Sequence, residues 1–167
     1  MSDGASDGGE QVFLVSIDPT SFERTISSPV DPAAGDDGPD ALSGLDSARL
    51  YAVPEGTRSE ETFERMLPGD LLLFYAEGTY LGVGRVGSTF EADAGWVDDV
   101  FEDEEASTNV VSVADFVPLD IDRAAANRLF DYGPTYTPQG LMRVAPERVT
   151  ASVSAIELAV QRFDERQ

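Results

Sequence analysis

The strongest local pattern in this sequence is a pair of apolar segments joined by a short glycine-containing turn. The longest purely apolar run is Leu71 to Ala76, and Glu77-Gly78-Thr79 then leads into Tyr80 to Ser88. Two runs of strand length on either side of such a turn are typical of a β-hairpin. We therefore expect a hairpin at the centre of the domain. A run of six apolar residues is far short of the roughly 20 that cross a bilayer, so we expect no membrane span.

Apolar periodicity and capping residues predict further elements around the hairpin. We expect strands over residues 12–17, 49–53, 109–117 and 141–144, with Pro118 ending the third of them. We expect helices over residues 20–26 and 59–67, a short one in which Ile121, Ala125 and Leu129 form an apolar stripe, and a C-terminal one opened by Pro146. This order predicts an α+β fold, a small curved β-barrel with flanking helices.

Two polar segments are expected to lie outside this core. Residues 31–44 are rich in Pro, Gly and Asp and predict a mobile loop, and residues 91–105 contain eight acidic residues and predict a solvated excursion. Residues 1–10 are expected to form a disordered acidic tail without the features of a secretory signal. Residues 11–167 are then a single domain with a C-terminal helix, which we expect in the cytoplasm.

The charge of the chain limits its chemistry. The sequence has 32 acidic and 11 basic residues, a formal charge of −21, and it contains no Lys, His or Cys. These absences exclude Ser-His-Asp and Cys-His nucleophiles, Lys Schiff bases and Cys/His zinc sites. Because the acidic residues are spread along the chain, they favour adaptation to a cytoplasm of molar salt, that is, a halophile. The alternative is an acidic module that binds a basic partner.

Three motifs that suggest ligands have simpler explanations. Residues 82–87 fit the glycine pattern of a dinucleotide site, but they lie inside a predicted strand, where glycines permit a bend or a close backbone approach. The acids of residues 98–105 lack the glycine and alternating ligands of a calcium loop. No pair of carboxylates is singled out for sugar hydrolysis. We therefore expect no metal and no cofactor.

Aromatic residues at predicted strand ends and in loops are the remaining unusual feature. A flat ligand can stack on such rings, and arginines can donate hydrogen bonds to its edge or its phosphate. The structural alternative is that Tyr75 and Tyr80 form a cross-strand pair and that Trp96 covers the core. The aromatic candidates are Tyr51, Tyr75, Tyr80, Trp96, Tyr132 and Tyr136, and the arginines are Arg58, Arg85 and Arg143.

Several of these segments resemble a known family. Residues 12–16, residues 51–56 and above all the stretch from Met66 to Tyr75, with Leu81 to Val86 after it, are similar to EVE and related domains of the PUA-like superfamily. The sequence departs from EVE domains at residues 57–60, where an Arg/Gln/Asn-rich segment is usual, and at Tyr51, where a Trp is expected. The resemblance covers residues 12–144.

The resemblance implies a curved barrel whose mouth holds a nucleobase in an aromatic cage. On this basis Tyr51, Arg58 and Tyr75 are the best pocket candidates, and Tyr80, Trp96 and Arg143 are added from the residue pattern. The first hypothesis is a non-enzymatic module that captures a single base of RNA or modified DNA, with or without a modification. The second is a small carboxylate-dependent hydrolase, and the third is a protein-interaction adaptor without a ligand pocket.

Overall fold

A computed structural model describes residues 11–31, 42, 45, 47–101 and 106–165. The expected tail at residues 1–10 and most of the expected loop at residues 31–44 lie outside these ranges. Six strands form one sheet in the order β2-β5-β4-β3-β1-β6, in which β1 and β3 are parallel and the other neighbours are antiparallel. The strands are β1 (Val12–Ser16), β2 (Arg49–Pro54), β3 (Leu71–Ala76), β4 (Thr79–Glu91), β5 (Ala106–Asp122) and β6 (Leu141–Arg143).

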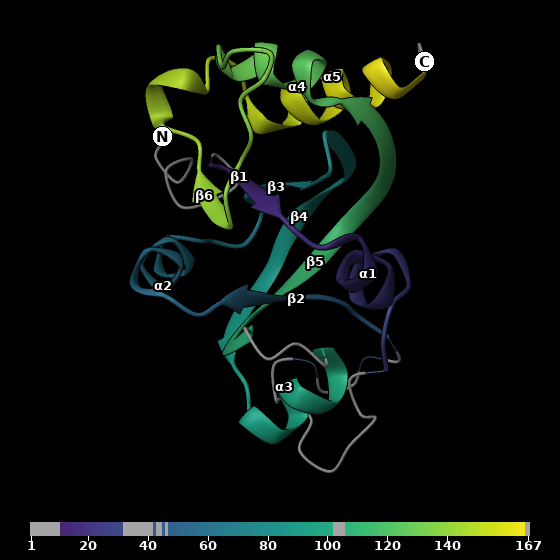
Figure 1. Ribbon diagram of the computed structural model, residues 1–167, viewed down its shortest axis with the longest axis vertical. Coiled ribbons are helices and arrows are strands. Elements are labelled where there is room, and N and C mark those ends of the chain that lie inside the picture. The colour runs from purple at the N-terminus through teal and green to yellow at the C-terminus, as the bar shows by residue number, and fades with distance from the viewer. Residues whose placement is uncertain (1–10, 32–41, 43–44, 46, 102–105, 166–167) are drawn as a thin grey trace.

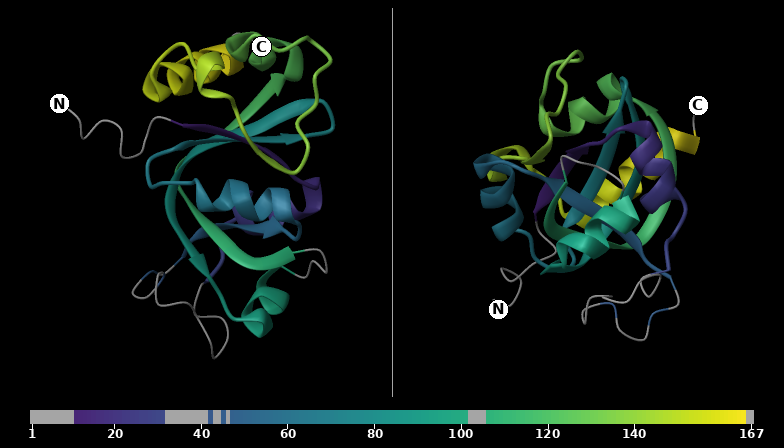
Figure 2. Two further views of the ribbon diagram at one scale, coloured as in Figure 1. Left: turned by 90° about the vertical axis from the view of Figure 1, so that its left-hand side faces the viewer. Right: turned by 60° about the horizontal axis from the view of Figure 1, so that its bottom comes forward.

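Helices cover both faces of this sheet. They are α1 (Pro19–Phe22) with the π-helical turn η2 (Glu23–Ser27), α2 (Thr57–Glu64), α3 (Ala94–Phe101), α4 (Arg123–Asn127) with the 3-10 turn η4 (Arg128–Phe130), the 3-10 turn η5 (Pro146–Arg148) and α5 (Val153–Glu165). The long strands β4 and β5 bend along their length, so the sheet curls into a half-barrel, with α4 and α5 at one end and α3 at the other (Figure 1, Figure 2). The expected curved sheet with flanking helices is confirmed.

The hairpin expected at the centre is formed by β3 and β4. Every residue of β3 is buried, because β3 pairs with β1 on one side and with β4 on the other and is covered on both faces. Successive side chains point to opposite faces, so Leu71 and Leu73 join the core under α4 and α5, while Leu72 and Phe74 join the core beside α1. The sheet therefore separates two apolar cores.

Glycines in β4 allow its close contact with β5. A Cβ on Gly84 would lie 2.5 Å from Cγ1 of Val113, and a Cβ on Gly82 would lie 2.4 Å from Cε1 of Phe116. No side chain fits at these positions unless a neighbour moves. The sequence interpretation of residues 82–87 as strand glycines at a close approach is confirmed.

The expected solvated excursion at residues 91–105 is wrong for the residues that the structure describes. Strand β4 continues to Glu91, and α3 then buries Trp96, Val97 and Phe101 in a third apolar cluster with Leu50 and Val110. Acidic residues such as Asp98 occupy the exposed side of this helix. The prediction failed because the acidic composition of the segment outweighed the apolar side of an amphipathic helix. Residues 102–105 lie outside the described ranges.

Several other boundaries differ from the expected ones; for example, α2 covers Thr57–Glu64 and not residues 59–67. Strand β5 continues through Pro118 to Asp122, because Pro118 lies opposite Gly82 at an irregularity in the register, where the ladder does not need its missing N–H. Ile121 is therefore a strand residue, and the helix after it begins at Arg123. Pro146 opens the short turn η5, and the long C-terminal helix begins at Val153. No helix in the described ranges is both long and apolar enough to span a membrane.

Candidate functional site

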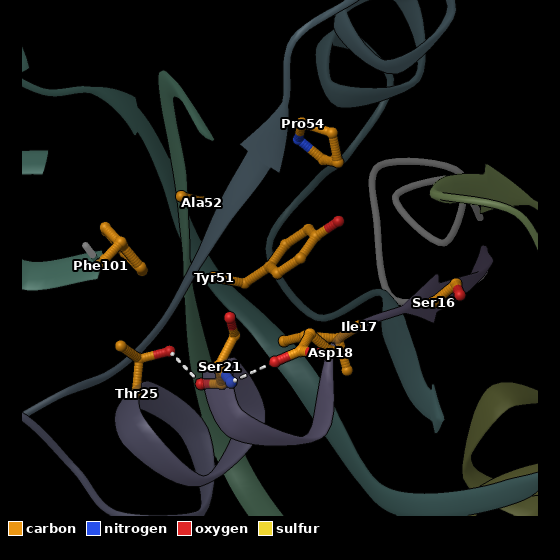
Figure 3. A pocket seen from close by; sticks show the side chains of 9 residues that line it. All are labelled: Ser16, Ile17, Asp18, Ser21, Thr25, Tyr51, Ala52, Pro54 and Phe101. Carbon is orange, nitrogen blue, oxygen red and sulfur yellow. Dashed lines mark hydrogen bonds between the residues drawn. The ribbon is translucent and has the colours of Figure 1, made fainter. Parts of the chain in front are cut away.

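A cavity of about 170 Å³ lies where the end of β1, the first turn of α1 and the middle of β2 meet (Figure 3). Residue Phe101, at the end of α3, closes one side of it. The lining is mixed: an aromatic ring and aliphatic groups alternate with hydroxyls and one carboxylate. The residues that line it are Ser16, Ile17, Asp18, Ser21, Thr25, Tyr51, Ala52, Pro54 and Phe101.

The polar part of the wall comes from the start of α1. Oδ2 of Asp18 accepts hydrogen bonds from the backbone N–H groups of Thr20 and Ser21, at 3.0 and 3.3 Å, which caps the helix. The next residue, Pro19, has the φ angle that a first helical position needs. Ser21 and Thr25 are four residues apart and therefore share a helix face, and the Thr25 hydroxyl donates to the Ser21 carbonyl at 3.2 Å. The cap thus fixes one carboxylate beside two hydroxyls.

Strand β2 supplies the aromatic part of the wall. It lies at the edge of the sheet and pairs with β5 on one side, so its second edge has backbone N–H and C=O groups that the sheet does not use. Tyr51 is only 4 % exposed and packs into the core beside α1, with its ring along the cavity, and Ala52 follows it on the wall. The cavity therefore combines a ring with the edge of a strand.

The last wall depends on α3. Phe101 packs edge-on against Trp96, with ring centroids 6.2 Å apart, and its carbonyl accepts a hydrogen bond from Arg24 at 3.3 Å. These contacts hold α3 against η2 and place a second aromatic side chain on the cavity, on the side away from β1 (Figure 3). The site is thus assembled from three segments that are far apart in the sequence, residues 16–25, residues 51–54 and Phe101.

Size and lining limit what the cavity can hold. A volume of 170 Å³ is smaller than the roughly 300–1,000 Å³ of pockets for drug-sized ligands, and it is the space of about six water molecules. An aromatic wall suits a flat group, while the carboxylate and hydroxyls suit hydrogen-bond donors and acceptors at its edge. Among the described residues, no three His, Cys, Asp or Glu side chains gather as metal ligands would.

The structure places the six predicted site residues at five different places. Tyr51 lines the cavity. Arg58 is exposed on the first turn of α2, four residues after the lining residue Pro54. A Cβ on Gly140 would lie 3.9 Å from Oγ of Ser59, and the Gly140 carbonyl accepts a hydrogen bond from the N–H of the lining residue Ser16, so this turn of α2 is at the cavity rim.

Tyr75 and Tyr80 lie in the other core, under α4 and α5, and do not line the cavity. They face each other across the hairpin with ring centroids 5.2 Å apart, which is the structural alternative that the sequence analysis considered. Burial raises the pKa of Tyr80. Burial also acts to raise the pKa of Tyr75, but hydrogen bonds from Thr137, Arg123 and the backbone N–H of Gly78 outweigh it and lower that pKa.

Trp96 and Arg143 are also outside the cavity lining. Trp96 is 2 % exposed and packs against Phe101. This agrees with the structural alternative, in which Trp96 covers the core. Arg143 is half-buried on β6, where its guanidinium donates to Oε1 of Gln11 at 3.2 Å. Of the predicted set, the structure brings Tyr75 and Tyr80 together and leaves Tyr51 apart from both.

Sequence reasoning missed most of the cavity wall. Asp18 caps α1 and Ser21 lies in its first turn, but a helix cap in a sequence gives no sign that it faces a cavity. Phe101 was hidden in the acidic segment that was expected to be solvated. Val97, Val100 and Phe101 recur at spacings of three and four residues from Val97, and this is the signal that could have revealed the helix.

The fold recurs in solved structures of nucleic-acid-binding domains. The chain is similar to the N-terminal domain of Thermococcus gammatolerans McrB bound to m5C DNA, with a TM-score of 0.66 and 20 % identity over 91 % of this chain and 98 % of that one. It is also similar to the Pho92 YTH domain in complex with m6A, with a TM-score of 0.52 and 10 % identity over 89 % of this chain and 87 % of that one.

A third similar structure is the YTH domain of Zygosaccharomyces rouxii MRB1 in complex with N6-methyladenosine RNA, with a TM-score of 0.50 and 10 % identity over 89 % of this chain and 87 % of that one. No protein-family model and no curated protein matches the sequence. At these identities the likeness concerns the fold. The chain has the PUA-like fold, a small curled sheet flanked by helices, which these domains share.

Proposed function

We propose that the cavity beside Tyr51 binds a single base of RNA or DNA, with or without a modification, and that the protein is a non-enzymatic nucleic-acid-binding module. The observation that carries this proposal is a cavity of about 170 Å³ with Tyr51 and Phe101 among its lining residues, in a fold whose similar structures include domains bound to m5C DNA and to N6-methyladenosine RNA. The module corresponds to residues 11–167. We also propose that this module is an EVE-like domain.

Stacking supplies the first part of the binding energy. A base that leaves its strand enters the cavity and lies against the ring of Tyr51, with Phe101 as a second aromatic wall. Base–aromatic stacking contributes about 1–3 kcal/mol per base. A single-stranded or mismatched base costs the least to extrude from its neighbours.

Hydrogen bonds to the edge of the base supply selectivity. Oδ2 of Asp18 is held by two backbone N–H groups, so Oδ1 is the oxygen that a ligand would meet. A carboxylate oxygen accepts from the exocyclic amino group of cytosine or adenine, a donor that uracil and thymine lack. The free edge of β2 beside Ala52 offers further backbone donors and acceptors.

The two other hypotheses have less support. Acid–base hydrolysis by carboxylates needs two of them at the substrate, and among the described lining residues Asp18 is the one carboxylate. A protein-interaction adaptor would present a contiguous apolar surface. The large hydrophobic side chains that are exposed in the described chain, Leu45, Leu67 and Leu158, belong to three separate segments.

We also propose the cytoplasm of a cell that accumulates molar salt as the place where this module acts. The spread of 32 acidic residues along the chain supports this assignment. Near 1 M salt the Debye length is about 3 Å, so the negative charge of the whole molecule would not keep a nucleic acid away from the cavity.

The experiment that tests the proposed function is a titration in molar KCl with a panel of nucleosides and short single-stranded oligonucleotides. The panel contains cytosine, 5-methylcytosine, adenine and N6-methyladenine. Emission of Trp96 reports on the cavity, because Trp96 contacts the lining residue Phe101. We expect Tyr51→Phe to keep binding and Tyr51→Leu, which keeps the apolar volume but removes the ring, to lose about tenfold or more.

Tyr132→Leu is the matched control, because Tyr132 is a half-buried, stacked tyrosine in the other core. We expect it to bind like the wild type. Failure of the wild-type protein to respond to any member of the panel would overturn the proposed function. Equal binding by Tyr51→Leu and the wild type would show that bases bind elsewhere.

A further inference from the structure

Two exposed arginines share one face of α2. Arg58 and Arg65 are seven residues apart, which is nearly two helical turns, so their side chains leave the helix on the same side. Around the helix axis, Glu60 lies about 140–160° and Glu64 about 100–120° from the two arginines. Glu61 lies on the arginine side, but within the described chain neither guanidinium comes within 4.0 Å of a carboxylate. Both arginines are therefore available to an external anion.

A third guanidinium lies at the same end of the molecule. The side chain of Gln11 donates to the carbonyl of Arg65 at 2.8 Å and accepts from Arg143 at 3.2 Å, so it bridges the end of α2 to β6. We call Arg58, Arg65 and Arg143 the α2 arginine surface. Helix α2 also exposes Glu60, Glu61 and Glu64, so the α2 arginine surface offers guanidinium groups without a net positive charge.

This surface begins at the rim of the cavity. The chain passes from the lining residue Pro54 directly into α2, and Arg58 is on the first turn of that helix. Ser59 is next to Gly140, and Gly140 is bonded to the lining residue Ser16. A strand whose base occupies the cavity would thus have its sugar and phosphate at this turn.

The other two helices around the cavity are less suited to a polyanion. Helix α3 exposes Asp98 and Asp99 and has no basic residue. On the α1 side, the guanidinium of Arg24 is bonded to the carbonyl of Phe101, and Glu23 is exposed beside it. Of the three helices, α2 is the one that offers guanidinium groups along a path leading from the cavity.

We propose that the phosphates that flank the bound base run along the α2 arginine surface. This inference rests on the proposed function and adds the path of the strand. Arginine donates two parallel hydrogen bonds to a phosphate, which a flexible ammonium group does not match, and such contacts fix position without reading sequence. The ligand is accordingly an extended single strand or an extruded nucleotide with phosphates on the α2 side.

The test compares the double variant R58Q/R65Q with the matched double variant R128Q/R162Q. Arg128 and Arg162 are exposed on η4 and α5, so both variants lose two charges, but only the first loses them beside the cavity. The probes are N6-methyladenosine and 5-methylcytidine as nucleosides, and short single-stranded oligonucleotides that contain each of these bases. Affinities are measured over a series of KCl concentrations.

We expect the oligonucleotides to bind the wild type more tightly than the nucleosides do. Each phosphate contact contributes about 0.7 to the slope of log affinity against log salt, so R58Q/R65Q should lower that slope by about 1.4 and weaken oligonucleotide binding several-fold. Nucleoside affinity should not change, and R128Q/R162Q should behave like the wild type.

Three results would contradict the inference in distinguishable ways. Equal salt slopes for both double variants and the wild type, with nucleosides still bound, would overturn the strand path and leave the base cavity in place. Loss of nucleoside binding in R58Q/R65Q would show that the arginines act on the cavity and not on phosphates. Absence of any binding by the wild type would overturn the proposed function and the strand path together.

Discussion

Asp18 caps α1, and in the proposed function it also accepts a hydrogen bond from the base, so a single substitution can separate the two roles. Asn is as good a helix cap as Asp, so Asp18→Asn should keep the hydrogen bonds to Thr20 and Ser21 and leave the unfolding temperature unchanged. It would also place an amide NH₂ where a ligand amino group needs an acceptor. We expect about tenfold weaker binding of cytosine and adenine nucleosides, the value of one hydrogen bond to a charged group.

Asp18→Ala provides the comparison for this variant. It removes the cap as well and should cost about 1 kcal/mol of stability in addition to the loss of binding. Titrations and thermal unfolding of both variants check the two effects separately. If Asp18→Asn prefers cytidine over uridine as strongly as the wild type does, the Asp18 carboxylate does not recognise the base.

Tyr80 gives the fold a predictable sensitivity to alkali. Burial raises the pKa of Tyr80 above its ordinary value of 10.0, so above pH 10 the unfolded chain loses this proton while the folded chain keeps it. The folded state then binds more protons than the unfolded state, and stability falls as the pH rises, by up to about 1.4 kcal/mol per pH unit for one group. The raised pKa of Tyr132 acts in the same direction, and the lowered pKa of Tyr75 acts in the opposite one.

Tyr80→Phe removes this proton together with a long, 3.5 Å hydrogen bond to Oδ1 of the buried Asn127, so the pH dependence of stability, and not its absolute value, is what the variant tests. Urea unfolding between pH 9 and pH 12 should show a flatter decline of stability for the variant than for the wild type. A parallel decline in the two proteins would indicate that Tyr80 ionises as it does in the unfolded chain.

At the scale of the elements, the contact between β4 and β5 depends on glycine. A methyl group on Gly84 would meet Cγ1 of Val113 at 2.5 Å and the carbonyl of Ala114 at 3.2 Å. Gly84→Ala should therefore lower the free energy of unfolding by about 1–3 kcal/mol, as overpacking in a core does. Gly133→Ala is the control, because no atom lies within 4 Å of a Cβ at that position. Equal stability of the two variants in urea would mean that the strands can separate at no cost.

The elements that the sequence predicted are those defined by short-range patterns. The hairpin of β3 and β4 follows from two apolar runs and a turn, and β1 and α1 follow from an apolar run and a cap. Helix α3 was missed because acidic residues on its exposed side dominate its composition. The end of β5 was missed because Pro118 is tolerated at a register irregularity that only the pairing with β4 creates.

The cavity was less predictable than the fold because its wall is not local in sequence. Tyr51 came from the resemblance to EVE domains, and it is the one predicted residue that lines the cavity. Asp18 and Phe101 reach it through the curl of the sheet and the insertion of α3, which no pattern within either segment encodes. Tyr75 also came from the resemblance, and Tyr80 was added as an aromatic residue at a strand end, but both side chains belong to the core under α4 and α5.

At the scale of the whole molecule, the charge predicts how stability depends on salt. Several arginines bind backbone carbonyls, as Arg49 does with Ile26 and Arg148 with Phe130, and such bonds do not depend on an ion pair. Screening should mainly reduce repulsion among the acidic residues, because the Debye length falls from about 10 Å at 0.1 M to about 3 Å at 1 M. We expect the unfolding temperature to rise with KCl.

Sorbitol at the same osmolality is the control for this effect, because it changes water activity without screening charge. It should raise the unfolding temperature less than KCl does. A fall in unfolding temperature between 0.1 M and 1 M KCl would contradict this account, since it would mean that favourable ion pairs outweigh the repulsion expected from a formal charge of −21.

The most direct measurement of the central claim is a crystal structure of the protein with a short oligonucleotide that contains one N6-methyladenine or 5-methylcytosine. The account predicts one base in the cavity between α1, β2 and α3, with its ring against Tyr51 and its polar edge toward Asp18. A nucleic acid bound at another surface, with the cavity beside Tyr51 filled by water alone, would contradict it.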